Sequence, residues 1–255
     1  MHGESGEDGT LQGFFQQLKV PYVGSGVAAS AVGLDKHLTK SVLTAHGVAV
    51  TPGLTLRGSD LTDSEAAMQK LKEAGLKFPV FVKPRNGGSS FGVTRATDLP
   101  TLSTAIADAA VLDPVVLVER EMSGREIDLA VLEFPEGRID TAPALEIHSD
   151  PDQPFFNATA KYDSSDTRFV VPAPLEPELA DRLRRTAIEV FEVLGCKGLA
   201  RVDFFVPADG EPVVNEVNTF PGFTPASQFP RMWAAAGMSY AEVVDTLIRT
   251  ALAQQ

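Results

Sequence analysis

The stretch RVDFFVPADGEPVVNEVN, residues 201–218, places acidic and amide side chains on two segments that otherwise read as apolar β-strands. The Asp-Gly pair between them favours a tight turn, so we predict a β-hairpin. Side chains two residues apart on a strand share a face, which puts Arg201 with Asp203 and Glu216 with Asn218. Pairing across the turn can then bring Asp203 next to the second pair.

Two carboxylates and an amide oxygen in one place form a hard-oxygen site of the kind that suits Mg²⁺. Acidic side chains are costly to bury alone, and a cation would offset the repulsion between Asp203 and Glu216. Mg²⁺ usually keeps waters and shares oxygen ligands with substrate phosphates. The alternative is a surface strand with solvated acids. We favour the cation site because three oxygen ligands and Arg201 coincide on apolar strands.

Composition limits the classes of function. The chain has 255 residues, of which 44% are hydrophobic, enough for one large domain or two to three small ones. The net charge of −12, with scattered basic residues, argues against a nucleic-acid partner or an anionic membrane surface. The single cysteine excludes a disulfide framework. No apolar run approaches the roughly 20 residues of a spanning helix, so we expect a soluble, cytoplasmic protein.

Helical and strand patterns alternate along the chain, which predicts a mixed α/β fold. A polar, irregular stretch at 149–170 is long enough to be a functional loop. We expect helices at 10–19, 27–46, 63–75, 99–110, 176–194 and 239–253, and strands at 20–23, 48–53, 78–84, 93–96, 115–121, 124–134 and 138–148, besides the hairpin.

Two further segments carry candidate ligand-binding residues. Lys83 leaves a buried strand just before the glycine-rich loop at 86–92, where backbone N–H groups can surround phosphate oxygens. A plain turn is the other interpretation of this loop. Glu119 ends the strand in VERE, residues 118–121, either as a solvated carboxylate or as an acceptor for groups of a nucleotide.

A dinucleotide-binding pattern occurs at 23–30, VGSGVAAS. That pattern requires an acidic residue about twenty positions further on, at the end of the next strand. The sequence TAHGVAVTPG offers none there, so a dinucleotide-dependent oxidoreductase is disfavoured.

Taken together, the motifs resemble the D-alanine–D-alanine ligases, including the related vancomycin-resistance ligases, within the ATP-grasp superfamily. The likeness runs nearly end to end. It is carried by HGESGEDGTLQG (2–13), PYVGSGVAASAVGLDKHLTK (21–40), FPVFVKPRNGGSSFGV (78–93), VLVEREMSGREIDLAVL (116–132), AKY (160–162), LGCKGLARVDFF (194–205) and NEVNTFPGFT (215–224).

The resemblance implies an ATP-grasp fold of class α/β (α+β), in which two antiparallel-sheet lobes sandwich ATP. Residues 1–24 would be the remnant of an N-terminal Rossmann-like substrate domain. Residues 25–121 would form the central lobe, and residues 122–255 the C-terminal lobe with the magnesium site. The loop at 149–170 would be a lid over the site.

The resemblance also implies the cofactors. Two Mg²⁺ ions, or Mn²⁺ in their place, would be held by Asp203, Glu216 and Asn218, in agreement with the hairpin. The residues expected to bind ATP are Lys36, Lys83, Ser90, Glu119, Arg120, Met122, Glu126 and Lys161.

The implied reaction joins the carboxylate of D-alanine to the amine of a second D-amino acid through an acyl phosphate, as in the synthesis of peptidoglycan precursors. Arg201 and the N–H of Gly222 would face the developing oxyanion, and Ser89 and Tyr162 would help to orient the first substrate. The residues expected to contact the amino acids are His2, Ser227 and Gln228. The family is often dimeric, so a homodimer is expected.

Two departures from the family pattern leave alternatives open. The family normally has another α/β segment before the motif that begins at His2, including a glutamate that engages the first D-alanine, so a truncated ATP-binding pseudoenzyme is one alternative. Gln228 stands where leucine or arginine is usual in the family. A ligase for other amino acids in a secondary-metabolite pathway is therefore the other.

Overall fold

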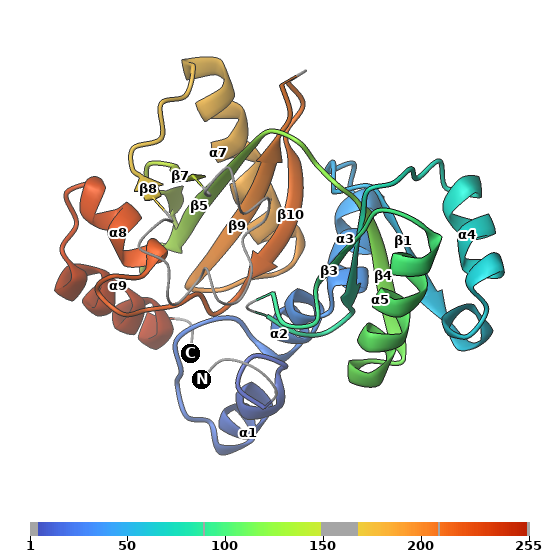
Figure 1. Cartoon of the computed structure of the whole chain (residues 1–255). Helices are drawn as coiled ribbons and strands as arrows, with labels where there is room; N and C mark the ends of the chain where they lie inside the picture. Colours follow the sequence, from blue (N-terminus) through green and yellow to red (C-terminus); the bar gives the residue numbers. More distant parts are fainter. Residues whose placement is uncertain (1–4, 89, 149–167, 209, 254–255) are drawn as a thin grey trace.

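The computed structural model describes residues 5–88, 90–148, 168–208 and 210–253. These residues form two lobes, each built on an antiparallel sheet (Figure 1). The smaller sheet has the order β1-β4-β2-β3, with β1 (Gly53–Arg57), β2 (Val80–Pro84), β3 (Thr94–Ala96) and β4 (Val115–Arg120). The larger has the order β10-β9-β5-β7-β8, and β6 also pairs with β5. Its strands are β5 (Arg125–Glu133), β6 (Ile139–Thr141), β7 (Leu145–His148), β8 (Arg168–Val170), β9 (Leu199–Val206) and β10 (Val213–Asn218).

Helices cover both sheets. In the smaller lobe, α4 (Ser64–Glu73), which follows the 3₁₀ turn η1 (Gly58–Leu61), and α5 (Leu99–Leu112) pack on the sheet. In the larger lobe, α7 (Pro177–Val193) covers one face, while α8 (Gln228–Ala235) and α9 (Tyr240–Ala253) cover the other. The helices α1 (Thr10–Leu18), α2 (Val27–Leu34) and α3 (Lys36–Ala45) precede β1, and α2 and α3 contact β10 (Figure 1).

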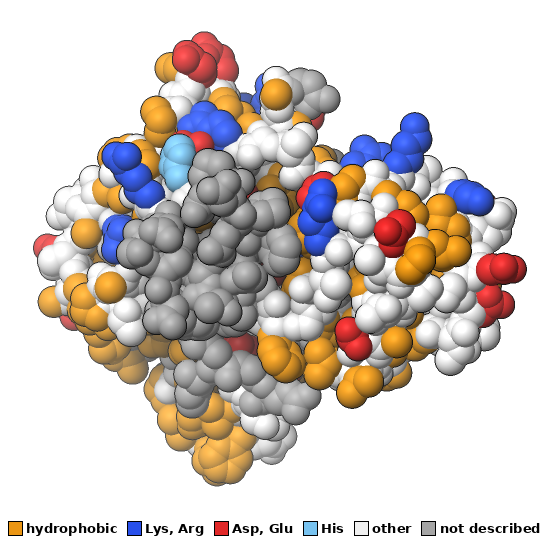
Figure 2. All heavy atoms as spheres, viewed as in Figure 1, with side chains coloured by type: hydrophobic (Ala, Val, Ile, Leu, Met, Phe, Trp, Pro, Cys, Tyr) orange, Lys and Arg blue, Asp and Glu red, His pale blue; other side chains and the backbone are white. Residues whose placement is uncertain are grey.

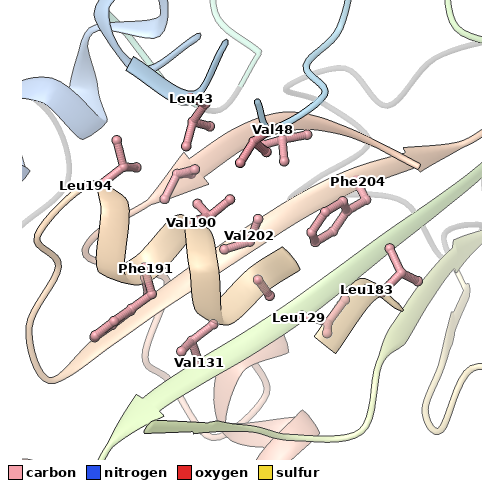
Figure 3. Close-up of a cluster of buried hydrophobic side chains, with 14 of the residues drawn as sticks. Leu43, Val48, Leu129, Val131, Leu183, Val190, Phe191, Leu194, Val202 and Phe204 are labelled. Atoms are coloured by element: carbon pink, nitrogen blue, oxygen red, sulfur yellow. The ribbon is translucent and has the colours of Figure 1, made fainter. Parts of the chain in front are cut away.

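Alternation along β5 and β9 decides which face of the larger sheet carries which residues. Ile127 and Leu129 of β5 belong to the core beneath α7, whereas Ala130 and Leu132 belong to the core beneath α8. The same period of two puts Val202 and Phe204 of β9 on the α7 side (Figure 3). Arg201 and Asp203, which alternate with them along the strand, therefore face the α8 side.

The core beneath α7 gives a first test of the fold. Phe191 of α7 is fully buried against this cluster (Figure 3). Replacing Phe191 with Ala is expected to lower the free energy of unfolding by about 3–5 kcal/mol, because it removes buried apolar area and leaves a cavity. Urea unfolding measures the loss. Val111→Ala is the matched control, since Val111 is 85% exposed and its truncation should cost within about 0.5 kcal/mol. Equal losses in both variants would contradict this packing.

The structure corrects the sequence-based elements in several places. The strand β1 begins at Gly53, where the strand expected at 48–53 ends, and the single strand expected at 138–148 is the two strands β6 and β7. The single helix expected at 27–46 is two helices, because Asp35 adopts an extended conformation and its carboxylate accepts a hydrogen bond from Leu38 N, capping α3. Residues 20–23 do not form the expected strand within the described part of the chain. The helix α8 was not expected, although its buried positions Phe229, Met232 and Trp233 follow helical spacing.

Exposed apolar side chains gather on α1, at the lower tip of the molecule in Figure 2. Phe14 is 57% exposed and Leu18 is 55% exposed. None of the helices in the described residues combines the length and the apolarity that crossing a membrane requires.

The last strand of the smaller sheet along the chain ends at Arg120, and the first strand of the larger sheet begins at Arg125. The domain limits at 24 and 121 stay a prediction, as does the Rossmann-like remnant.

Candidate functional site

A cleft lies where the two sheets face each other. It is lined by the loop after β2, the end of β4, the start of β5 and the β9–β10 hairpin. Of the residues expected from the sequence, those lining this cleft are Lys36, Lys83, Ser90, Glu119, Arg120, Met122, Glu126, Arg201, Asp203, Glu216 and Gln228. Asn218 lines an adjoining hollow, to which Lys36 and Glu216 also contribute. Most of the candidate residues that the structure describes thus converge on one place.

The β9–β10 hairpin brings the expected oxygen donors together. Glu216 pairs directly with Asp203, and Asn218 pairs with Arg201, after a register shift between Val214 and Glu216. Asn218 Nδ2 donates to Asp203 Oδ2 at 3.0 Å. Directly paired residues share a face of the sheet, so the two carboxylates and the amide lie on the same side. This is the geometry that the sequence predicted.

Arg201 is the buried positive charge beside these carboxylates. Its Nε and Nη2 donate to the two oxygens of Asp203, each at 2.7 Å, which makes a bidentate ion pair. Burial alone would lower the pKa of Arg201, but the neighbouring Asp203 and Asp128 hold this pKa above its usual value. The guanidinium therefore stays charged within the cleft.

A third contact of Arg201 reaches across to α8. Its Nη1 donates to Gln228 Oε1 at 2.7 Å, and Gln228 Nε2 donates to Asp128 Oδ2 at 2.9 Å. Asp128 Oδ2 also lies 3.5 Å from Arg201 Nε. Asp128 was not predicted as a site residue. The feature that could have indicated it is a carboxylate two residues after Glu126, on the same face of an otherwise apolar strand.

Three charges gather on the smaller sheet's side of the cleft. Glu119 Oε2 lies 2.6 Å from Lys83 Nζ, and its other oxygen accepts a hydrogen bond from Lys40 Nζ. Burial would raise the pKa of Glu119, but Lys40 and Lys83 keep it below its usual value. Lys40 was not predicted as a site residue, although Lys40 lies one helical turn after Lys36 on α3. Lys40, Lys83 and Glu119 are thus joined in one ion-paired cluster.

Lys40 gives this cluster a predictable pH dependence. Burial, with the repulsion of Lys83, lowers the pKa of Lys40 from 10.5 to about 8, against the pull of Glu119. Between these values the unfolded chain binds a proton that the folded chain lacks, so this contribution to stability rises with pH and is lost as pH falls through 8. Relative to Lys40→Met, the wild type should therefore gain on the order of 2 kcal/mol of unfolding free energy between pH 8 and 10.5.

Urea unfolding of both proteins across this pH range measures the difference. Lys72→Met is the matched control, because Lys72 is exposed on α4 and its replacement removes no buried charge. A difference between wild type and Lys40→Met that stays constant with pH would show that the Lys40 ammonium remains charged throughout.

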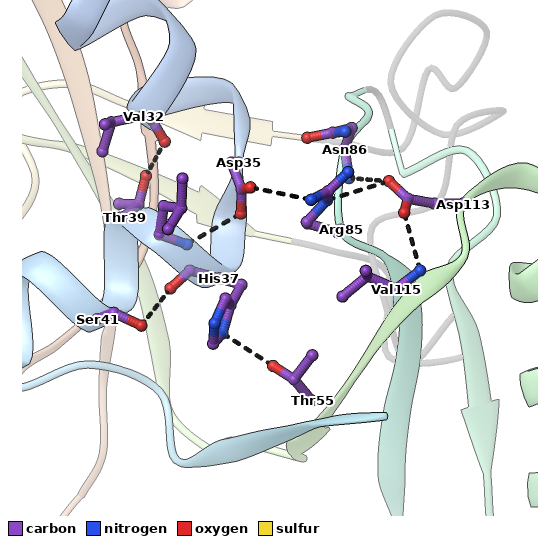
Figure 4. Close-up of polar contacts among 11 residues, drawn as sticks. Val32, Asp35, His37, Thr39, Ser41, Thr55, Arg85, Asn86, Asp113 and Val115 are labelled. Atoms are coloured by element: carbon purple, nitrogen blue, oxygen red, sulfur yellow. Dashed lines mark hydrogen bonds and ion pairs between the residues drawn. The ribbon is translucent and has the colours of Figure 1, made fainter. Parts of the chain in front are cut away.

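The glycine-rich loop is anchored at its first residues (Figure 4). Arg85 contacts Asp35 at 3.5 Å and Asp113 at 3.4 Å, and Asn86 N donates to Asp113 Oδ2 at 3.2 Å. Lys36 Nζ donates to the carbonyl of Gly87. The loop is therefore tied both to α3 and to the start of β4. Its backbone at 87–88 borders the cleft and the hollow beside it.

The remaining expected residues fall into two groups. Gly222 and Ser227 lie together in the loop before α8, where Ser227 Oγ accepts from Thr224 N at 3.0 Å. Ser227 directly precedes the cleft residue Gln228, and neither Gly222 nor Ser227 is among the described residues that line the cleft. His2, Ser89, Lys161 and Tyr162, together with most of the expected lid at 149–170, lie outside the described residues.

The sequence matches the family model described as the D-ala D-ala ligase C-terminus over residues 42–249. A protein named D-alanine–D-alanine ligase from Nocardia farcinica is 49% identical over all of this chain and 69% of its own length. One of the same name from Streptomyces avermitilis is 47% identical over 99% of the chain and 66% of its own length. The chain belongs to the D-alanine–D-alanine ligase family.

Solved structures of D-alanine–D-alanine ligase family proteins have the same fold. The D-alanine-D-alanine ligase from Coxiella burnetii superposes with a TM-score of 0.86 at 34% identity, over 99% of this chain and 66% of that one. The VanG D-Ala:D-Ser ligase from Enterococcus faecalis gives 0.86 at 36% identity, over 98% of this chain and 71% of that one. The two antiparallel lobes are those of the ATP-grasp fold, as the resemblance implied. The chain spans about two thirds of the length of these relatives.

Membership of the D-alanine–D-alanine ligase family implies the use of ATP and a divalent metal, and the residues present fit such a metal. Asp203 and Glu216 supply carboxylate oxygens, and Asn218 keeps its amide oxygen as an acceptor after donating through Nδ2. Among the described residues, no group of three or more His, Cys, Asp or Glu side chains is arranged so that it could hold a metal ion by itself. A cation here would therefore complete its shell with waters and phosphate oxygens, as Mg²⁺ commonly does.

Proposed function

We propose that this protein is an ATP-dependent ligase that joins the carboxylate of D-alanine to the amine of a second D-amino acid. The observation that carries the proposal is the convergence of the hairpin carboxylates, Arg201 and the lysine cluster on one cleft in a chain of this family. Cations on one side and metal-binding oxygens on the other suit a triphosphate, whose negative charge must be balanced along its length.

In the first step, a carboxylate oxygen of D-alanine attacks the γ-phosphorus of ATP. The bond from that phosphorus to the bridging oxygen breaks, ADP leaves with the electron pair, and an acyl phosphate is formed. Lys83 and Lys36 would hold the phosphates, and Lys83 is ion-paired with Glu119. Two Mg²⁺ ions at Asp203, Glu216 and Asn218 would supply charge neutralisation.

In the second step, the amine of the other amino acid attacks the acyl carbon. A tetrahedral oxyanion forms, the bond from carbon to the phosphate oxygen breaks, and the amine loses a proton as phosphate leaves. Arg201 would stabilise the oxyanion from within a buried, low-dielectric site. The N–H of Gly222 would be a second donor, and Ser89 and Tyr162 would orient the first substrate. Adenine and ribose would lie against Arg120, Met122 and Glu126, and Lys161 would reach the γ-phosphate.

Release of phosphate from ATP, measured with D-alanine, D-serine and their L-enantiomers, tests the proposal. We expect release only with D-amino acids, together with a dipeptide product identified by mass spectrometry. Binding of ATP with Mg²⁺ but without phosphate release for any amino acid would instead identify a nucleotide-binding protein without ligase activity.

The acceptor amino acid could be D-serine instead of D-alanine. The similarity to a D-Ala:D-Ser ligase supports testing D-serine beside D-alanine in the same assay. The expected contacts of His2 and Ser227 with the amino acids and a homodimer stay predictions from the resemblance. A cytoplasmic location stays a prediction from the hydropathy of the sequence. Sedimentation at micromolar concentration measures the oligomeric state.

A further inference from the structure

Gln228 occupies a position where its amide has two partners of opposite character. Its Oε1 accepts from Arg201 Nη1 at 2.7 Å, and its Nε2 donates to Asp128 Oδ2 at 2.9 Å. A guanidinium can only donate and an ionised carboxylate can only accept. The two neighbours therefore fix which end of the amide faces which way, and a flipped amide would lose both hydrogen bonds.

Gln228 and its partner Asp128 both lie on regular elements that pack in one core. Asp128 is 2% exposed in the middle of β5, between strands β7 and β9. Gln228 is the first residue of α8, and Phe229, immediately after it, is fully buried against β5 and its neighbours. The amide is thus suspended between a strand and a helix that share one core. Side chains supported in this way keep their orientation better than side chains on loops.

Arg201 is consequently anchored at two places. Asp203 takes the Nε and Nη2 side of the guanidinium, and Gln228 takes Nη1. A bidentate pair alone fixes one edge of the planar group, and the third bond, from a different element, fixes its tilt. These bonds use three of the five N–H donors of the guanidinium.

We propose that Gln228 and Asp128 form a clamp that positions Arg201 for the amide-forming step, so that Gln228 acts on the guanidinium rather than on the acceptor amino acid. This inference rests on the proposed function. The amide at position 228 therefore does not widen the range of acceptor amino acids. Instead, Gln228 fixes the guanidinium of Arg201, which stabilises the oxyanion, and a displacement of that guanidinium by about 1 Å costs about 100-fold in rate.

Kinetics of the variant Gln228→Met test the clamp, because methionine fills a similar volume without hydrogen-bonding atoms. We expect kcat for dipeptide formation to fall about 10- to 100-fold. The KM for the acceptor should stay within about twofold, and the order of preference between D-alanine and D-serine should not change. Gln69→Met, the same replacement at an exposed glutamine of α4, is the matched control and should leave all constants unchanged.

Two variants of Asp128 refine the test. Asp128→Asn keeps an oxygen that can accept from Gln228 Nε2, so its kcat should fall less than that of Asp128→Ala. Combining Asp128→Ala with Gln228→Met should cost little more than the worse single change, because both break one clamp. If Gln228→Met instead raises the acceptor KM or reverses the preference while kcat is unchanged, Gln228 contacts the acceptor and the clamp is refuted.

Nuclear magnetic resonance separates a failure of the clamp from a failure of the proposed function. The side-chain N–H signals of Arg201 are assigned by their loss in Arg201→Lys. In Gln228→Met the Nη1 signal should broaden or vanish while the Nε signal persists, whether or not the wild type makes a dipeptide. Unchanged Nη1 signals would overturn the proposal, and a wild type that is inactive with every D-amino acid would refute only the ligase function.

Discussion

Replacing Arg201 with Lys is expected to lower the rate of dipeptide formation by about 100- to 1000-fold. Lysine keeps the positive charge but offers a single ammonium in place of a planar fork. Its donors radiate from one nitrogen, so they cannot reproduce the three bonds that separate guanidinium nitrogens make to Asp203 and Gln228, and the oxyanion loses donors aimed from a fixed plane. ATP binding, measured by the fluorescence of a nucleotide analogue, should weaken much less than turnover.

The matched control for Arg201 is Arg125→Lys. Arg125 makes the same kind of bidentate pair, with Glu146 at 2.7 Å for both bonds, but it is not among the residues that line the described cleft. Its replacement should leave kcat within about twofold. Similar losses of turnover in the two variants would show that breaking an ion pair, rather than removing an oxyanion donor, slows the reaction.

Replacing Glu216 with Gln is expected to abolish most nucleotide turnover while leaving the fold intact. The change removes one of two carboxylates at the proposed Mg²⁺ site, which removes several kcal/mol of charge stabilisation, equivalent to about 100- to 1000-fold in rate. The Mg²⁺ concentration for half-maximal phosphate release should rise as well. A coupled assay for ADP across a Mg²⁺ titration measures both effects, and circular dichroism checks the fold.

Glu211→Gln controls for the loss of a carboxylate on the same hairpin. Glu211 is exposed and pairs with Arg182 at the surface, so its replacement should change neither turnover nor Mg²⁺ dependence. A Glu216→Gln protein that turns over ATP normally with Mg²⁺ present would remove the basis for a metal site on this hairpin.

The hairpin could be predicted from the sequence because its signals are local. The turn residues, the apolar strands and the period of two are all contained in residues 201–218. Lys83 and Glu119 were singled out because each ends a recognisable buried strand, while their assignment to an ATP site came from the resemblance. The class of fold followed from the order of such segments.

Other features depend on contacts between distant segments, which no local pattern reveals. Lys40 and Glu119 are 79 residues apart, and Gln228 and Asp128 are 100 residues apart. Lys40 and Asp128, taken alone, each read as an ordinary polar side chain. Only the packing of α3 and α8 against different strands shows that their charges are paired. The break at Asp35 was missed for another reason, because apolar periodicity continues across it while the cap depends on backbone geometry.

The irregular register of β10 has a consequence for how the length of this chain can vary. Val214 and Val217 both face the core, although strict alternation would place residues three apart on opposite faces. The extra residue, Asn215, absorbs that mismatch. Losing it would still leave Val214 opposite Phe204 and Glu216 opposite Asp203. Deleting Val217 would instead bring Glu216 or Asn218 opposite Val202, on the face that packs into the core, so a single-residue gap in this strand is tolerable at Asn215 and disruptive at Val217.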